Sequence, residues 1–164
     1  MHNQSKWKEF KDAVSVGNIS ITVDLIEAMD NINRHDEDDG CTALILATIN
    51  QNTVIVDTLL SAGADVFITD NYEWNAIRLA AKIGDISIFS ILMRACIATN
   101  DYRNYYQEAY AALHIACLFN QYNIVLSLIH IYGLDPWELS FEGQTAWEFT
   151  FCEVLQRKMH DACI

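Results

Sequence analysis

A short sequence motif recurs along the chain at an almost constant interval. Thr42 opens the clearest copy, and the matching position falls at Asn75, 33 residues later. The next copies place it at Ala111, after another 36 residues, and at Thr145, after another 34. A period in this range is typical of stacked supersecondary units, each of which buries its apolar face against its neighbours. The repeat therefore predicts an extended array of small units.

Each copy of the motif predicts two short helices separated by a tight turn. The segment 40–65 reads GCTALILATINQNTVIVDTLLSAGAD, and its apolar residues form two stripes at helical spacing. Gly63 can adopt a positive φ and is expected to end the second helix. The predicted core of this copy is Leu44, Ala47, Ile55, Val56, Leu59 and Leu60.

Other stretches fit the same pattern. Ile124, Val125, Leu128 and Ile129 form the second apolar stripe of a later unit. The N-terminal segment fits a degenerate first unit through Phe10, Ala13, Gly17, Ile21, Leu25 and Ile26.

The motifs resemble those of ankyrin repeats. The segment 42–47 (TALILA) takes the place of the T-P-L-H-x-A signature, and 112–116 (ALHIA) matches P-L-H-x-A. The segment 79–85 (LAAKIGD) is similar to the L-A-A-x-x-G-H core. The resemblance covers nearly the whole chain and implies an all-α ankyrin-repeat solenoid of about five helix-turn-helix units joined by hairpin-like loops. We expect one domain, 1–164, with units at about 5–35, 36–69, 70–104, 105–138 and 139–164.

Two parts of the array depart from the pattern. The third unit lacks the closing G-A-D sequence, so we expect a longer irregular connection over 94–106, within an insertion that extends to residue 110. A neutral insertion in a surface loop would explain the same spacing. The last unit diverges after Trp147, and its two helices are expected to be short or merged.

Charge and composition narrow the classes of function. The formal net charge of −12 disfavours nucleic-acid binding, which needs clustered cations. No apolar run approaches the length of a membrane span, and 1–10 lacks the apolar core of a signal peptide, so we expect no membrane partner and a cytoplasmic or nuclear location. The five cysteines are odd in number and form no C-x-x-C pair, which argues against a disulfide framework and a zinc site.

Catalytic motifs are missing from the sequence. There is no phosphate-binding glycine loop, no H-E-x-x-H and no G-x-S-x-G. By the family resemblance, His114 is a structural hydrogen-bonding residue at the base of a hairpin. We therefore expect no catalytic residue, no cofactor and no metal, and a non-enzymatic protein. An enzyme built on a repeat scaffold is kept as a remote alternative.

The resemblance implies a protein partner on the concave side, because ankyrin domains in general bind through their hairpin tips and the exposed positions of their first helices. In this chain several such positions hold large apolar groups, which usually mark an interaction surface. The acidic run Asp36–Asp39 suggests either a solvated loop or a finger tip for a basic partner. The resemblance also places Cys41 and Glu108 at exposed, partner-facing positions of the repeats. The predicted partner-binding residues are Asp36, Asp38, Asp39, Tyr72, Trp74, Ile83, Tyr106, Tyr110, Leu118, Phe119 and Phe141.

A more specific alternative is a short inhibitor-of-NF-κB-like protein. The five-unit size and the third unit, which reads Ile91–Cys96 (ILMRAC) before its insertion, are similar to that group. Such a protein would be a viral or bacterial effector that sequesters a host transcription factor in the host cell.

Overall fold

The computed structural model describes residues 2–138 and Thr145, with side chains from Ser5 onward. These residues form eight α-helices and no β-strand, which confirms the all-α fold class. The chain divides into two compact units, Met1–Leu79 and Ala80–Ile164, and each is described by itself. None of the helices in the described part is long and apolar enough to cross a bilayer.

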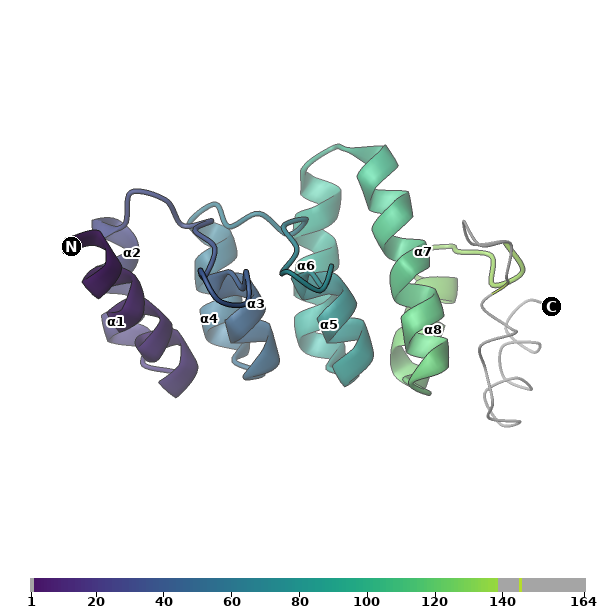
Figure 1. Ribbon diagram of the computed structural model, residues 1–164. Coiled ribbons are helices and arrows are strands. Elements are labelled where there is room, and N and C mark those ends of the chain that lie inside the picture. Colours follow the sequence, from purple (N-terminus) through teal and green to yellow (C-terminus); the bar gives the residue numbers. More distant parts are fainter. Residues whose placement is uncertain (1, 139–144, 146–164) are drawn as a thin grey trace. The chain divides into compact units, whose positions relative to one another are not determined.

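The first unit contains two complete helix pairs (Figure 1). They are α1 (His2–Val16) with α2 (Ile19–Ala28), and α3 (Ala43–Ile49) with α4 (Thr53–Ser61). α1 packs against α2 and α3, while α4 packs against α3 and α2. Helix α5 (Ala76–Ile83) begins at the end of this unit.

The second unit continues with the end of α5 and three further helices (Figure 1). These are α6 (Ile86–Ala98), α7 (Tyr102–Leu118) and α8 (Tyr122–His130). α6 packs against both α7 and α8, and α7 packs against α8. The core predicted for α8 is confirmed, because Ile124, Val125, Leu128 and Ile129 are all buried.

The core predicted for 40–65 is confirmed with one exception. Leu44, Ala47, Ile55, Val56 and Leu59 are buried, whereas Leu60 is half-buried.

In the degenerate first unit, Phe10 and Ala13 are buried as expected. Ile21 instead faces solvent with 42% of its surface exposed, and its neighbour Thr22 is buried. Leu25 and Ile26, on the same side of α2 as Thr22, are half-buried, so the pattern of this helix is wrong at Ile21 alone.

A left-handed residue separates the two helices of every pair in the described chain. Gly17, Gln51, Gly84 and Asn120 occupy this position, with φ of 79°, 54°, 87° and 56°. The next residue is the N-cap of the second helix. Asn18, Asn52 and Asp85 accept hydrogen bonds there from the backbone N–H groups of Ile21, Ile55 and Ile88. This cap satisfies one of the free donors at the helix start and fixes the turn.

The expected irregular connection over 94–106 is wrong, because the chain there is almost entirely helical. α6 continues to Ala98, Asn100 takes a left-handed φ of 57°, and α7 begins at Tyr102. Asp101 caps the new helix by accepting from the Asn104 N–H at 3.1 Å. No glycine or proline occurs between Gly84 and Gly133 to interrupt helix formation.

The helical connection also corrects the role of Ala111. Thr42 and Asn75 each cap a first helix, by accepting from the N–H groups of Ile45 and Arg78. Ala111 lies inside α7 and needs no capping side chain. The expected fifth unit, 139–164, lies outside the described residues apart from Thr145, and so does Phe141.

Candidate protein-binding surface

The acidic run 36–39 forms a tight finger-like turn in the first unit. The Asp36 N–H donates to the Cys41 carbonyl at 2.9 Å, and the Gly40 N–H donates to the Asp36 carbonyl at 3.1 Å. The Asp36 carboxylate accepts from the Asp38 N–H, and the Asp39 carboxylate accepts from the Cys41 N–H, both at 2.9 Å. Two of the predicted partner-binding acids therefore also hold the turn together.

Asp36 does not lie at an exposed tip, contrary to the sequence-based expectation. It is 8% exposed, and its carboxylate forms an ion pair with the Lys11 ammonium of α1. Burial requires that the charge be paired, and Lys11 supplies the partner. Asp38 and Asp39 are exposed as expected. Cys41 is buried, so its assignment to an exposed slot is also wrong.

A second turn of the first unit carries Tyr72 and Trp74. The Asp70 carboxylate accepts hydrogen bonds from the N–H groups of both residues, at 2.8 and 2.9 Å. Tyr72 is 74% exposed, whereas Trp74 is half-buried. The two turns are joined, because the Asn71 N–H donates to the Asp39 carbonyl at 3.0 Å. The turns thus present Asp38, Asp39 and Tyr72 to solvent from a connected backbone.

In the second unit, the C-terminal end of α7 exposes two large apolar side chains. Leu118 is 44% exposed and Phe119 is 41% exposed. The Lys82 ammonium lies 5.2 Å from the centre of the Phe119 ring, within the range of a cation–π interaction. Ile83, next to Lys82 at the end of α5, is half-buried. Leu118 and Phe119 are therefore the exposed large apolar groups of this part of the surface.

Two tyrosines of the predicted set lie along α7. Tyr106 is exposed, and it lies on the helix and not on a hairpin tip. Tyr110 is half-buried, and its hydroxyl donates to the Glu138 carboxylate. Burial first, and then this hydrogen bond, raise the pKa of Tyr110 to about 12. Glu108 is 6% exposed, so its expected exposure is wrong: the residue lies on a buried face of α7.

The described residues offer no metal site, and the one histidine with a predicted role is held locally. No cluster of three potential metal ligands occurs among the described residues. His114 Nδ1 lies 2.7 Å from the Tyr110 carbonyl, one turn earlier on α7. Cys41, Cys96 and Cys117 are buried, and burial raises the pKa of both Cys41 and Cys96 to about 12. The thiols of Cys41 and Cys96 are therefore protonated at neutral pH and are poor nucleophiles.

Comparison of the sequence with known protein families identifies the family of this chain. The family described as "Ankyrin repeats (3 copies)" matches residues 10–104 and 54–139. This chain belongs to the ankyrin-repeat family. The resemblance inferred from 42–47, 79–85 and 112–116 is thereby confirmed.

The chain is also similar to segments of longer ankyrin-containing proteins. The RelA-associated inhibitor of Mus musculus is 31% identical over 83 residues, which make up 51% of this chain and 10% of that protein. The ankyrin repeat and SOCS box protein 3 of Bos taurus is 27% identical over 107 residues, 65% of this chain and 20% of that protein. The nuclear factor NF-kappa-B p105 subunit of Rattus norvegicus is 28% identical over 119 residues, 73% of this chain and 12% of that protein. The chain thus spans between 10% and 20% of the length of these relatives.

Proposed function

We propose that the chain is a non-enzymatic protein–protein interaction module. Its partner binds the finger turns and the exposed ends of the first helices, which form the concave side in ankyrin proteins. The main observation in favour is the exposure of Leu118 and Phe119, 44% and 41%, at the end of α7.

These two residues follow a firmly packed helical segment. Ala112, Leu113, Ala116 and Cys117 are all fully buried just before them. Leu118 and Phe119 are consequently presented by a rigid element, so a partner can bind them with little loss of conformational entropy. Burying one aromatic side chain removes about 150–250 Å² of surface from water. Such anchors commonly supply most of the binding energy of an interface.

The first unit adds a polar contribution. Tyr72 and the carboxylates of Asp38 and Asp39 are exposed on the connected turns. With the net charge of −12, they favour a partner that combines basic and apolar surface. Trp74, Ile83 and Tyr110 are half-buried and would contribute only part of their surface.

The test is a comparison of matched surface variants. The wild-type chain is immobilised, proteins captured from a cytosolic extract are identified, and the capture is repeated with a Leu118→Ser and Phe119→Ser double variant. We expect the captured partner to be lost. The control is Ile131→Ser. Ile131 is also an exposed apolar residue (75%), but it follows α8, the second helix of its pair, and so lies outside the proposed surface. Equal loss with both variants, or retention with both, would contradict the proposed surface.

A second proposal is that the partner is a transcription factor of the NF-κB class, sequestered in the cytoplasm or nucleus. The similarity to a RelA-associated inhibitor and to the NF-kappa-B p105 subunit favours it. In this proposal the chain is a viral or bacterial effector that acts inside a host cell. Direct binding of purified RelA-containing dimers to the chain, measured by calorimetry, would test it. No heat of binding at micromolar concentrations would refute this alternative and leave the general proposal intact.

A further inference from the structure

The helical connection between α6 and α7 creates a small notch lined by tyrosines. We use the name tyrosine notch for the pocket lined by Ile97, Asn100, Asp101, Tyr102, Tyr105 and Tyr106. Its volume is about 170 Å³. Tyr102, Tyr105 and Tyr106 are spaced i, i+3 and i+4 on α7, which places them on one face of that helix.

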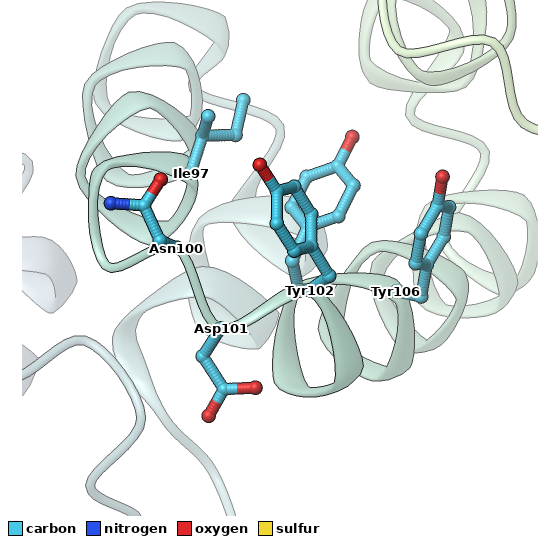
Figure 2. A pocket seen from close by; sticks show the side chains of 6 residues that line it. Ile97, Asn100, Asp101, Tyr102 and Tyr106 are labelled. Atoms are coloured by element: carbon cyan, nitrogen blue, oxygen red, sulfur yellow. The ribbon is translucent and has the colours of Figure 1, made fainter.

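Figure 2 shows how the side chains of the tyrosine notch are arranged. The rings of Tyr102 and Tyr106 rise from α7 on the same side, and the Ile97 side chain of α6 points the same way. Tyr105 and Tyr106 are in edge-to-face contact, with ring centres 5.1 Å apart. Tyr102 is 67% exposed, Tyr106 is 54% exposed and Ile97 is 44% exposed. The notch is therefore open to solvent and largely apolar.

Charge indicates what the tyrosine notch can bind. The face of an aromatic ring carries negative potential and attracts a cation. No lysine or arginine lines the notch, and its one charged residue is Asp101. The Asp101 carboxylate points away from the rings and caps α7 (Figure 2). The chain as a whole carries a formal net charge of −12.

Two other rings among the described residues, those of Trp7 and Phe119, have a cation of their own. The Lys82 ammonium lies over Phe119 at 5.2 Å, and the Arg34 guanidinium lies over Trp7 at 5.7 Å. Among the described residues, no cation lies over Tyr102, Tyr105 or Tyr106. Tyr102, Tyr105 and Tyr106 thus form a cluster of aromatic rings that has no cation from the described part of the chain.

We propose that the tyrosine notch binds an arginine side chain of a partner protein. The guanidinium lies against the ring faces of Tyr102 and Tyr106, and the aliphatic stem of the arginine packs on Ile97. Arginine fits better than lysine, because its planar, weakly hydrated head stacks on aromatic rings. This binding surface is separate from Leu118 and Phe119, so it does not depend on the surface proposed above.

The test uses a small probe of known chemistry. The probe is the capped pentapeptide Gly-Gly-Arg-Gly-Gly, and its comparison peptide carries citrulline, which has nearly the shape of arginine without its charge. Binding to the folded chain is followed by nuclear magnetic resonance of ¹³C-labelled tyrosine rings. We expect the arginine peptide to shift the signals of Tyr102 and Tyr106, and to leave Tyr72 unchanged. We expect the citrulline peptide to bind at least about threefold more weakly, the scale of an exposed cation–π pair.

Matched variants separate binding in the notch from attraction to an acidic surface. Tyr102→Leu with Tyr106→Leu removes two ring faces and keeps the net charge and apolar bulk. We expect the affinity for the arginine peptide, read on Tyr105, to fall at least about fivefold. Tyr72→Leu is the control, since Tyr72 is also highly exposed but lies on a turn of the other unit. An unchanged affinity in the double variant, or equal affinity for the two peptides, would overturn the proposal.

Failure of this experiment is distinguishable from failure of the proposed function. The peptide assay reports on Tyr102 and Tyr106, whereas the capture assay depends on Leu118 and Phe119. Circular dichroism of the double variant verifies that it is folded, which we expect because both replaced side chains are mainly exposed.

Discussion

Gln121 lies directly against Gly84. Its amide Nε2 donates a 2.8 Å hydrogen bond to the Lys82 carbonyl, and its Oε1 occupies the space where a Cβ on residue 84 would stand. Gly17 and Asn52 have a similar relationship in the first unit, because a Cβ on Gly17 would meet the Asn52 amide at 2.8 Å. The turn of one helix pair thus packs against the start of the second helix in the next pair. These contacts link neighbouring repeats within each unit, in addition to the packing of their helices.

Gly84→Ala should destabilise the second unit in two ways. A side chain at φ +87° costs about 1–2 kcal/mol, and displacing Gln121 removes a hydrogen bond that contributes about 0.5–1.5 kcal/mol. The control is Gly63→Ala, where φ is +90° but nothing lies within 4 Å of the new Cβ. Urea unfolding should show the larger loss for Gly84→Ala. Equal losses would mean that the Gln121 contact contributes nothing.

The helix pairs were largely predictable from the sequence, because their apolar spacing and capping residues are local signals. Thr42, Asn52 and Asp85 each cap a helix where the repeat pattern predicts one. The connection between α6 and α7 was not predicted correctly. The family pattern implies a hairpin there, whereas Asp101 and the absence of glycine and proline favour a helix. The i, i+3, i+4 spacing of Tyr102, Tyr105 and Tyr106 was the available signal for it.

The candidate site was predictable only in part, because exposure depends on contacts distant in sequence. Lys11 lies 25 residues before Asp36 and converts an expected surface acid into a buried ion pair. Leu118 and Phe119 were identified from their position in the repeat, and their exposure agrees with that expectation. Their role in binding stays a prediction.

Asp36→Asn should destabilise the first unit. The substitution removes the charge that pairs with Lys11 and weakens the acceptor for the Asp38 N–H, and hydrogen bonds to charged groups contribute about 1.5–3 kcal/mol. Asp38→Asn is the matched control, because Asp38 is exposed in the same turn and its backbone bond to Asp36 is retained. Thermal unfolding should show a lower midpoint for Asp36→Asn alone. A similar small effect for both variants would show that the ion pair is energetically neutral.

Leu59→Ala should be far more damaging than Leu60→Ala. Leu59 is fully buried in α4, so its truncation leaves a cavity and should cost about 2–5 kcal/mol. Leu60 is half-buried on the same helix and its site can refill with solvent. The measurement is the free energy of unfolding in urea for both variants. Indistinguishable values would contradict the core assignment of α4.

The buried thiol of Cys96 should make stability fall at alkaline pH. Its folded pKa is raised from 9.0 to about 12 by burial, so the native state keeps the proton while the unfolded state loses it above pH 9. The stabilisation is fully present below pH 9 and is lost as the pH rises toward 12. A Cys96→Ala variant should lose less stability between pH 8 and pH 10.5 than the wild type does. Parallel curves for the two proteins would show that the thiol does not contribute.

The final prediction separates binding from stability at Tyr110 and Phe119. Tyr110 is half-buried and bonded to Glu138, so Tyr110→Ala would remove structural contacts, and Tyr110→Phe is the appropriate variant. We expect Tyr110→Phe to lower stability by about 0.5–1.5 kcal/mol and to leave partner affinity nearly unchanged.

Phe119→Ala should instead leave stability nearly unchanged and weaken partner binding, because the ring is exposed and contacts Lys82. An anchor of this kind contributes about 2 kcal/mol or more to binding, so the dissociation constant should rise at least about tenfold. Calorimetric titration against the captured partner, with unfolding curves for each variant, measures both quantities. If Phe119→Ala instead unfolds the protein, its ring belongs to the core and the partner binds elsewhere.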